Sequence, residues 1–583
     1  MTLHLAPADW IVLGLYFCIP LGVGWALRKK GSKDSASFLL SGRSLPWWLA
    51  GTSMAADTFG SDTPLYVARI VREAGVAANW EWWCFAFSGL LSVFLLAPLW
   101  RRTEAVTDLE FCEMRYGGRP AAFLRGFKAF LLAVPFNCIL LGGMPVLAMT
   151  KILLVTAGVD DPGAVPVEKA AAIAACLGVV LAYAAVSGLW AVVVNDLIML
   201  VLALAGAVTL ACYAVAEVGG LEALREKVLA LDGGDPWRTA LLPSPGGGPG
   251  IAFSAFLVWV GFQWWNHRTA DGGGVFAQRM LACRSEGHAV GATLWFNALN
   301  YAVRTWPWVL TALAAVVLYP SVADPEAAYP RLMRDLLPAG VRGFILASLF
   351  AAFMSTADTQ LHWGAGYLVN DLYRRFLVKE APDRHYVKAS RVALAGLVGV
   401  VAVVAFSATS VTTVFQFLLR FFAGTGTVFL GRWLWWRVNA WGEIAAVTAA
   451  PLASLAWQGL TAKEAALEGV PGHWGIPAVA AVTTAAWLSA TLLTRPVEME
   501  RLVAFYRKTR PPGFWGPVRA AAPDLPPPAR VGRDLLRWLA GLVLVLGAMA
   551  GLGEALLGSP AAAAVLLGAA ALAGAWIARS YRR

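Results

Sequence analysis

The chain has 583 residues, of which 58% are hydrophobic and only 14% are charged, and its formal net charge is +11 at pH 7. Because soluble proteins carry about 25% charged residues, this composition excludes a set of water-solvated domains and indicates a polytopic protein of the lipid bilayer. Most Lys and Arg residues lie in alternate loops between apolar runs. This is the pattern expected beside membrane spans, so we interpret the charge as an orientation signal and expect no nucleic-acid partner.

Fifteen apolar runs have about the length of 20 residues that a transmembrane helix needs. Arg28–Lys30 follow the first run, as in a retained span, whereas a signal peptide carries its charges before the apolar region. The charge pattern places the N-terminus outside and the C-terminus in the cytoplasm. The runs cover residues 8–28, 45–71, 78–100, 120–152, 168–187, 189–216, 250–275, 285–318, 339–376, 385–408, 410–436, 440–459, 474–495, 533–556 and 560–580.

The second and seventh runs contain residues that interrupt a helix. Gly51–Pro64 brings glycines, a proline and two carboxylates to mid-membrane depth, and Asn266–Gly274 ends in three glycines. Irregular backbone is tolerated in a membrane only where it lines a protein cavity, and paired interruptions point to a transporter site. The two runs are five spans apart, as a five-plus-five inverted repeat requires.

Ionisable residues inside apolar runs are costly and usually face a cavity or a partner. Arg304 and Arg420 either pair with Asp57 or Glu81 or bind an anionic substrate. Further along, Ala351–Thr359 presents residues 352, 355, 356 and 359 on one helical face, which offers hard oxygen ligands suited to an alkali cation. The candidate ionisable residues inside apolar runs are Asp57, Asp62, Glu81, Asp196, Arg304, Asp358 and Arg420.

Several short motifs follow one another in a family-specific order up to about residue 515. They are Gly42–Trp48, Thr107–Phe111, Arg115–Gly117, Ser187–Trp190 leading to Asn195–Asp196, Gln278–Ala282, Met354–Asp358 and Asn370–Tyr373. Together they resemble the sodium:solute symporter family. The resemblance implies an all-α membrane protein of about 15 transmembrane helices, with a leucine-transporter-like core of ten helices in two inverted halves, spans two to six and seven to eleven.

The apolar runs, the resemblance and the prolines at 511–512 and 526–528 together divide the chain into six segments. Residues 1–40 are expected to form an extra N-terminal transmembrane helix, and residues 497–532 an irregular cytoplasmic linker. The first inverted repeat with its exterior loop covers 41–249, the second covers 250–438, two accessory helices cover 439–496, and two C-terminal helices cover 533–583.

The family's shared sodium site maps onto backbone carbonyls and hydroxyls of two core helices. The carbonyls are those of Ala56, Phe59 and Ala352, and the hydroxyls are those of Ser355 and Thr356. A second cation position in some members maps onto Asp196, Asp358 and Thr359. Here an acidic group at 358 replaces the serine of the described sites, so it could bind a cation, take a proton or pair with a basic residue.

The resemblance also implies where a solute binds, at the two interrupted helices and on core helices two, seven and ten. Tryptophans, arginines and a glutamate suit a polar organic solute such as a sugar, a sugar acid or an organic acid. The expected substrate contacts are Asp57, Thr63, Glu81, Trp265, His267, Arg304 and Arg420.

The function expected from all of this is sodium-coupled import of a small polar solute by alternating access, in a multi-pass protein of the cytoplasmic (inner) membrane. Na+ is the one expected ion, and neither an enzymatic activity nor an obligate protein partner is expected. The alternatives are a solute-sensing membrane protein that signals to a partner and a proton-coupled carrier. An intramembrane hydrolase with Asp57 and Asp358 as a dyad has no supporting HExxH, Gly-x-Gly-Asp or serine-elbow motif.

Overall fold

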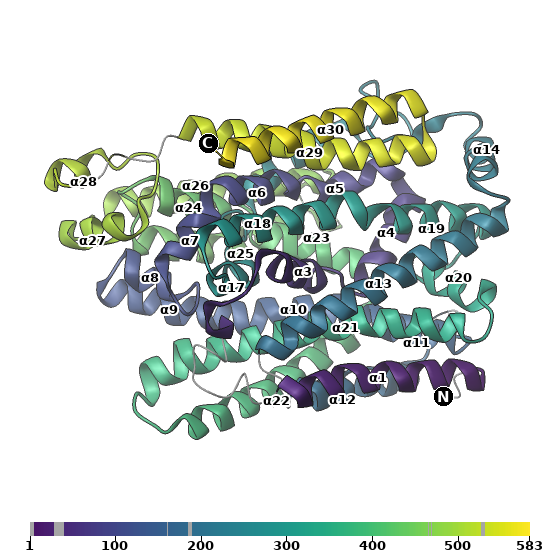
Figure 1. Ribbon diagram of the computed structural model, residues 1–583, viewed down its shortest axis with the longest axis horizontal. Coiled ribbons are helices and arrows are strands. Elements are labelled where there is room, and N and C mark those ends of the chain that lie inside the picture. The colour runs from purple at the N-terminus through teal and green to yellow at the C-terminus, as the bar shows by residue number, and fades with distance from the viewer. Residues whose placement is uncertain are drawn as a thin grey trace.

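The computed structural model describes residues 5–27, 40–159, 161, 163–184, 189–463, 466–467, 469–525, 527 and 531–582. Within these ranges the regular elements are helices, joined by two isolated bridges, Leu45–Cys283 and Trp435–Phe514. Most helices run along the longest axis of the molecule (Figure 1). Three features expected from the sequence lie outside the described residues, namely Arg28–Lys30, the start of the motif at Ser187–Gly188, and the terminal Arg583.

Nine helices in the described ranges are long and apolar enough to cross a membrane. A tenth is counted if α23 (Val411–Phe421) and α24 (Thr425–Leu434), bent by 46°, form one span. The fifteen spans expected from the sequence are therefore not confirmed as continuous helices. Interrupted runs are one reason, since their pieces are each too short to cross a membrane alone.

Both expected interruptions are present. The second run consists of α3 (Trp47–Asp57) and α4 (Asp62–Ala74), with Thr58–Ser61 outside the helices. The seventh run ends after α16 (Trp264–Asn266) and resumes as α17 (Val275–Ala282). Gly272 and Gly274 adopt φ of 75° and 72° within the second break, a conformation that glycine adopts without steric cost.

The core of the molecule consists of four helices around the first break. α3 packs against α13 (Leu189–Val218), α18 (Glu286–Asn297) and α21 (Val341–Gly366), and α13 also packs along α21. Figure 1 shows α3 at the centre of the molecule with α13 and α21 beside it. Because every residue from Leu49 to Asp57 is buried, α3 ends inside protein and not in lipid.

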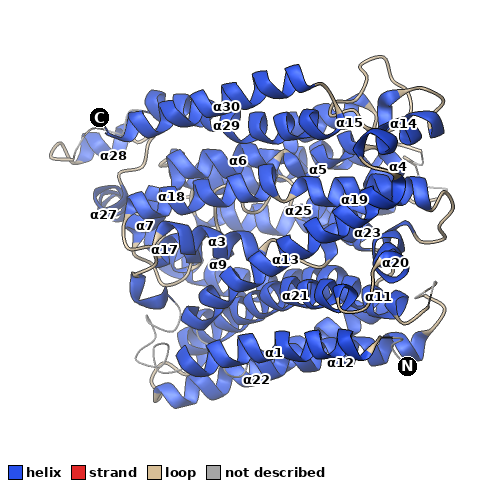
Figure 2. Ribbon diagram, turned by 45° about the vertical axis from the view of Figure 1, so that its right-hand side comes forward, coloured by secondary structure: helices blue, strands red, loops and turns tan. Residues whose placement is uncertain are grey.

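Two groups of helices cover opposite edges of this core in both ribbon views (Figures 1 and 2). The C-terminal pair α29 (Val531–Leu557) and α30 (Pro560–Arg582) covers one edge, and α1 (Pro7–Leu27), α12 (Pro166–Ala184) and α22 (Asp383–Ser407) cover the other. Large apolar side chains such as Val403, Val565 and Leu572 are exposed on them. Such surfaces suit contact with lipid.

Residues 497–532 differ from the expected irregular linker. They contain α27 (Met499–Thr509) and α28 (Gly516–Ala521), and α27 packs on α7 (Ala97–Thr103) and α8 (Glu110–Arg115). The prediction was wrong here because the prolines that suggested irregular backbone lie between and after these helices.

Wide helical turns with the π-helical pattern interrupt several long helices, and turns of this kind are frequent at functional sites. Pro135 and Pro145, which lack a backbone donor, lie in two of them. These segments are η3 (Ser92–Leu96), η4 (Leu132–Phe136), η5 (Gly142–Val146), η7 (Trp259–Gln263), η8 (Ala298–Val303) and η10 (Tyr367–Leu377).

The remaining elements complete the spans and their connections. They are η1 (Ser41–Arg43), η2 (Val76–Asn79), α5 (Trp80–Trp83), α6 (Phe85–Leu91), α9 (Gly118–Leu131), α10 (Asn137–Leu141), α11 (Leu147–Thr156), α14 (Leu221–Leu231), η6 (Pro236–Arg238), α15 (Phe253–Val258), α19 (Thr305–Leu318), η9 (Pro325–Ala327), α20 (Ala328–Leu336), α25 (Ala440–Leu460), η11 (Gly472–Trp474) and α26 (Gly475–Leu493).

Candidate functional site

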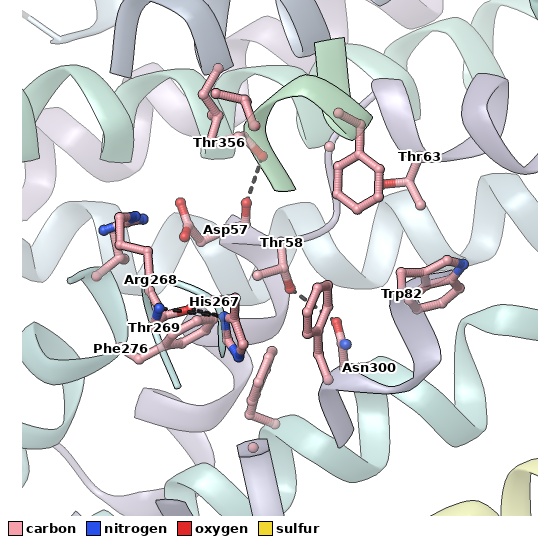
Figure 3. A pocket seen from close by; sticks show the side chains of 18 of the residues that line it. Asp57, Thr58, Thr63, Trp82, His267, Arg268, Thr269, Phe276, Asn300 and Thr356 are labelled. Carbon is pink, nitrogen blue, oxygen red and sulfur yellow. Dashed lines mark hydrogen bonds between the residues drawn. The ribbon is translucent and has the colours of Figure 1, made fainter. Parts of the chain in front are cut away.

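A cavity of about 370 Å³ lies between the two helix breaks, within the size range of small-molecule sites. In Figure 3, Arg268, His267 and Phe276 lie on one side, Thr63 and Trp82 on the other, and Asp57 and Thr58 between them. Four of the wide turns contribute lining residues. The polar lining residues include Asp57, Thr58, Asp62, Thr63, His267, Arg268, Thr269, Asn300, Arg304, Thr356 and Gln360, and the aromatic ones include Tyr66, Trp82, Phe85, Phe136, Phe276, Phe296, Tyr301, Phe415 and Phe422.

Backbone groups that the breaks release find partners on neighbouring elements. The carbonyl of Asp57 accepts a hydrogen bond from the Thr356 hydroxyl at 2.9 Å, which ties the end of α3 to α21. The carbonyl of Asn266 accepts one from the backbone N–H of Gly424 at 3.0 Å. Both breaks are thus held by protein donors, as irregular backbone at membrane depth requires.

Arg304 contacts the end of α3 and not the two carboxylates that the sequence suggested as its ion-pair partners. Its Nη1 lies 3.1 Å from Oγ1 of Thr58 and 3.4 Å from the carbonyl of Ala55, and its Nε donates to the carbonyl of Asn300 at 3.2 Å. Its cation is therefore placed at the negative end of the α3 dipole. Asp57 and Glu81, the two carboxylates proposed as ion-pair partners, form no salt bridge with it within the described residues.

The five residues expected to bind sodium are all buried, with at most 6% of any of them exposed. Thr356 reaches the first break directly through its bond to the carbonyl of Asp57. The hydroxyl of Ser355, the neighbouring residue, donates to Oδ1 of Asp196 at 2.7 Å. The hydroxyl face of α21 therefore meets the C-terminal end of α3 at the place where Ala56 and Phe59 lie.

Two of the three residues expected to hold a second cation, Asp196 and Thr359, contact a guanidinium. Arg279 on α17, 1% exposed, donates through Nη2 to Oγ1 of Thr359 at 3.1 Å and lies 3.9 Å from Oδ2 of Asp196. Oδ2 of Asp196 also accepts from the hydroxyl of Ser53 at 2.5 Å. Asp358 lies apart from these contacts, with Oδ1 3.0 Å from Nδ1 of His362 on the same helix. Arg279 belongs to the motif Gln278–Ala282, but nothing in the sequence indicates its partners.

His267 and Arg268 follow α16 in the second break. The ring of His267 lies between the hydroxyls of Ser88, 2.9 Å from Nε2, and of Thr269, 3.1 Å from Nδ1. The guanidinium carbon of Arg268 lies 4.2 Å from the ring centre of Phe136. Arg268 was not expected to contact a solute, and its position directly after His267 in the break was the available signal.

Three expected substrate residues do not line the cavity. Glu81 lies behind it and accepts hydrogen bonds from the Tyr66 hydroxyl at 2.5 Å and from Gln416 at 3.2 Å. The indole of Trp265 donates to a carbonyl of its own helix at 2.7 Å. Arg420 lies beside Gly475 of α26. Glu81 thus holds a cavity-lining tyrosine, while Trp265 bonds its own helix and Arg420 contacts α26.

Glu326 connects several elements at the end of the molecule that carries α14 and α20, which we call the α20 end (Figure 1). Its fully buried carboxylate accepts from Lys151 at 2.7 Å and from the backbone N–H groups of Val411 and Thr412 at the start of α23. Burial by itself raises its pKa, but Lys151 and these hydrogen bonds outweigh burial and hold the pKa below the ordinary 4.5. One carboxylate therefore joins η9 to α11 and α23.

Several ion pairs close the opposite end, which carries α27 and α28 and which we call the α27 end (Figure 1). Arg432 pairs with Asp271 of the second break at 2.7 Å and with Glu443 at 3.2 Å. Glu443 also binds Lys128 at 2.5 Å. Asp108 accepts from the backbone N–H of Gly274 at 2.9 Å, so the loop before α8 is bound to the second break.

The sequence motifs around residues 107–117 belong to the same closure. Arg125 pairs with Asp371 at 2.6 Å and with Glu113 at 2.7 Å. Burial raises the pKa of Glu113, but Arg375 and Arg125 outweigh it and hold that pKa below its ordinary value. Arg115 donates to the carbonyl of Arg432 at 3.0 Å and to two further carbonyls after α24. The motif therefore encodes contacts between the loop and the second half of the chain.

A sequence model described as the sodium:solute symporter family matches residues 38–449. Two similar proteins are the sodium/myo-inositol cotransporter 2 of Sus scrofa, 28% identical over 437 residues, and the sodium/glucose cotransporter 2 of Rattus norvegicus, 27% identical over 433 residues. These matches cover 67% and 66% of this chain and about three fifths, 59% and 61%, of the relatives. A solved structure of a Na+-coupled sialic acid symporter in a substrate-bound outward-open state shares the fold, with a TM-score of 0.63 and 18% identity over 85% of this chain and 99% of that one.

Proposed function

Because this chain belongs to the sodium:solute symporter family, we propose that it is a sodium-coupled secondary active symporter, and not an enzyme, that imports a small polar organic solute across the cytoplasmic membrane. The observation that carries the proposal is the cavity at the two helix breaks, where polar side chains meet inside an apolar protein. Alternating access then means that the cavity opens first toward one side of the membrane and afterwards toward the other.

We propose the membrane arrangement expected from the sequence, with about fifteen spans, two inverted repeats over 41–249 and 250–438, and the flanking segments as divided above. Two breaks that each leave a short helix on either side support the repeat. Residue 5 and residue 582 lie near opposite ends of the molecule (Figure 1). An N-terminus outside and a C-terminus in the cytoplasm makes the α20 end exterior and the α27 end cytoplasmic.

We propose that one sodium ion binds between α3 and α21, held by the carbonyls of Ala56, Phe59 and Ala352 and the hydroxyls of Ser355 and Thr356. These are hard oxygen ligands, and the carbonyls next to the break add the negative end of the α3 dipole. An ion that is bound by both α3 and α21 stabilises the conformation in which these two helices are in contact. Sodium and solute affinity are then coupled, because each ligand stabilises the same arrangement.

At the expected second cation position, Asp196 and Thr359 contact Arg279. The guanidinium of this arginine supplies the positive charge that a bound ion would otherwise supply. A second ion there would have to displace a guanidinium that is 1% exposed and bound to three partners. We therefore propose one sodium ion in each transport cycle. The solute is expected to contact Asp57, Thr63, His267 and Arg304, which line the cavity, whereas Glu81, Trp265 and Arg420 are not among the lining residues.

The decisive experiment is solute uptake into proteoliposomes under an inward sodium gradient, together with thermal shifts of the purified protein with and without sodium. Ser355→Ala and Thr356→Ala should each weaken sodium and solute affinity together. Ser407→Ala, on the exposed face of α22, is the matched control and should behave as wild type. Full sodium-dependent uptake by Ser355→Ala would show that the site is assigned wrongly, and solute stabilisation that ignores sodium would argue against symport.

A proton-coupled carrier is the second candidate, and the contact between Asp358 and His362 favours it. The carboxylate is 1% exposed and lies 3.0 Å from Nδ1 of a histidine, a type of side chain that commonly relays protons. This candidate requires uptake driven by an inward proton gradient without sodium. Loss of that uptake in Asp358→Asn, with sodium-driven uptake absent in wild type, would favour it over symport with sodium.

A further inference from the structure

Arg268 differs from Arg279, Arg304 and Arg432, the other buried arginines near the two helix breaks. It lines the cavity, and within the described residues its guanidinium has neither a hydrogen-bond partner nor a carboxylate oxygen within 4.0 Å. Its contacts are with ring faces, 4.2 Å from the centre of Phe136 and 5.4 Å from that of Trp363. A contact through a ring face uses none of the N–H donors of the guanidinium.

The neighbouring cations show how this protein normally compensates such a charge. Arg432 has two carboxylates, Arg279 has Asp196 and hydroxyls, and Arg304 has the carbonyls at the end of α3. An unpaired cation in a low-dielectric interior is costly, so intramembrane arginines are usually paired or functional. Arg268 therefore has an unused binding capacity directed at the cavity.

The carboxylates nearest to Arg268 along the break are already engaged. Asp271 accepts from Arg432 at 2.7 Å and from the indole of Trp433 at 3.1 Å. Asp108 accepts from Gly274 at 2.9 Å and from the hydroxyl of Tyr367. Turning either carboxylate toward Arg268 would break the contacts of the α27 end, so neither neutralises Arg268 in this arrangement.

We propose that the transported solute carries a carboxylate and that Arg268 binds it through its two parallel N–H donors. One free guanidinium matches one planar monoanion, because its two parallel N–H donors fit the two oxygens of a carboxylate. The remaining polar lining, which includes Thr58, Thr269 and Asn300, suits hydroxyl groups on the rest of the solute. The substrate class is thus a sugar acid or hydroxy acid. This inference rests on the proposed function, because it names the solute of the same cavity.

The test compares acids with neutral partners of the same shape, by binding to the purified full chain in sodium chloride and in choline chloride. The pairs are D-glucuronate with D-glucose, D-galacturonate with D-galactose, D-gluconate with D-sorbitol, and lactate with propane-1,2-diol. We expect at least one acid to bind in sodium about tenfold or more tightly than its neutral partner, the order of effect of one charge-assisted pair.

Variants identify the residue that recognises the charge. Arg268→Gln should reduce the preference for the acid to less than about threefold, and Arg268→Lys, which keeps the charge but not the fork, should retain part of it. Both should keep the thermal shift caused by sodium alone, which shows that the protein is folded. Arg384→Gln, at an exposed arginine, changes the net charge equally and should leave the preference intact.

Three results would overturn the inference: equal binding of the acid and its neutral partner by wild type, a full acid preference in Arg268→Gln, or no binding of any acid while the sodium response is intact. Sodium-driven uptake of a neutral solute would reject the carboxylate and keep the symporter. If neither sodium nor any solute affects wild type and no uptake occurs, the proposed function fails, and this inference with it.

Discussion

The two ends of the molecule are closed in different ways. At the α20 end one short segment supplies two carboxylates, Glu326 and Asp324, which both bind Lys151 at 2.7 Å, and Arg69, a second cation of Glu326, is 28% exposed and 3.7 Å away. At the α27 end, Asp271, Glu443 and Asp371 are each at most 1% exposed and pair with cations that are themselves buried.

This difference has a mechanical consequence. Glu326 belongs to η9, a three-residue helix in a connection, so one displacement of that segment removes all of its contacts together. The α27 end is held by several pairs on different elements, and no single displacement releases them. We expect the α20 end to open more readily than the α27 end. The proposed import requires that the exterior end, the α20 end, opens first.

The largest effect is expected at the α27 end from Arg432→Met. Removing this arginine leaves Asp271 without its ionic partner in a buried site, and breaking a buried pair typically costs about 3–5 kcal/mol. The thermal midpoint of the purified protein should fall sharply, or the variant should fail to fold. Arg507→Gln is the control, since it removes a pair with Asp524 in which both side chains are at least 60% exposed and should change the midpoint little. Equal effects of the two substitutions would contradict the importance given to the buried network.

A smaller loss of stability, about 1–3 kcal/mol, is expected from Glu326→Gln, because the amide keeps the shape but loses the charge facing Lys151. The functional readout is the labelling of Thr63→Cys by a membrane-impermeant thiol reagent, in a background with Cys18 and Cys212 replaced by alanine. Labelling should become several-fold faster as the α20 end opens. Asp335→Asn, which alters a half-exposed pair in α20, should leave the labelling rate unchanged. An unchanged rate in Glu326→Gln would mean that this carboxylate does not close the cavity.

Acid should open the same end without a mutation. The pKa of Glu326 in the folded protein lies below its ordinary 4.5, so its contribution to closure is complete above pH 4.5 and is lost as the pH falls through the lowered value. The labelling rate of Thr63→Cys, divided at each pH by that of glutathione to remove the change in thiolate fraction, should therefore be constant between pH 7 and about pH 5 and rise below pH 4.5. Glu326→Gln should not show this rise, and a rise of equal size in that variant would assign the pH dependence to another group.

The smallest effect is expected from Arg69→Gln. This arginine is part-exposed, shares its charge between Glu73 and Glu326, and exposed pairs contribute about 1 kcal/mol or less. Its effect on the thermal midpoint should shrink at high salt because of screening, whereas the effect of Arg432→Met should not. A large, salt-independent effect of Arg69→Gln would remove the contrast between the two ends.

The parts of the fold that sequence reasoning predicted are those encoded by neighbouring residues. Glycines and a proline inside an apolar run predicted both helix breaks, and the positions of Ser355 and Thr356 on one helical face predicted an oxygen-rich surface of α21. Helices within residues 497–532 were missed, because prolines between short helices look the same in sequence as an irregular linker. The number of continuous spans was not recoverable either, since a broken run and a straight one share the same composition.

The roles of charged residues were harder to predict, because burial and pairing depend on residues far away in the chain. Lys151 and Glu326 are 175 positions apart, and Arg432 and Asp271 are 161 apart. Glu81 and Arg420 look like cavity residues in the sequence, yet Glu81 is bound to Tyr66 and Gln416, Arg420 lies beside Gly475, and neither lines the cavity. Arg279 lies in a recognisable motif, but only the approach of α13 and α21 shows that it contacts Asp196 and Thr359.

The sequence by itself determined that this is a membrane protein with two interrupted helices and an oxygen-rich face, because apolar length, glycine and proline content and helical periodicity are local properties. Only the tertiary structure decided which of these charges are paired and which are not. The same arginine is a structural cap at 304, a tethered cation at 279 and an unpaired donor at 268. The difference lies entirely in what the neighbouring helices bring to within hydrogen-bond distance.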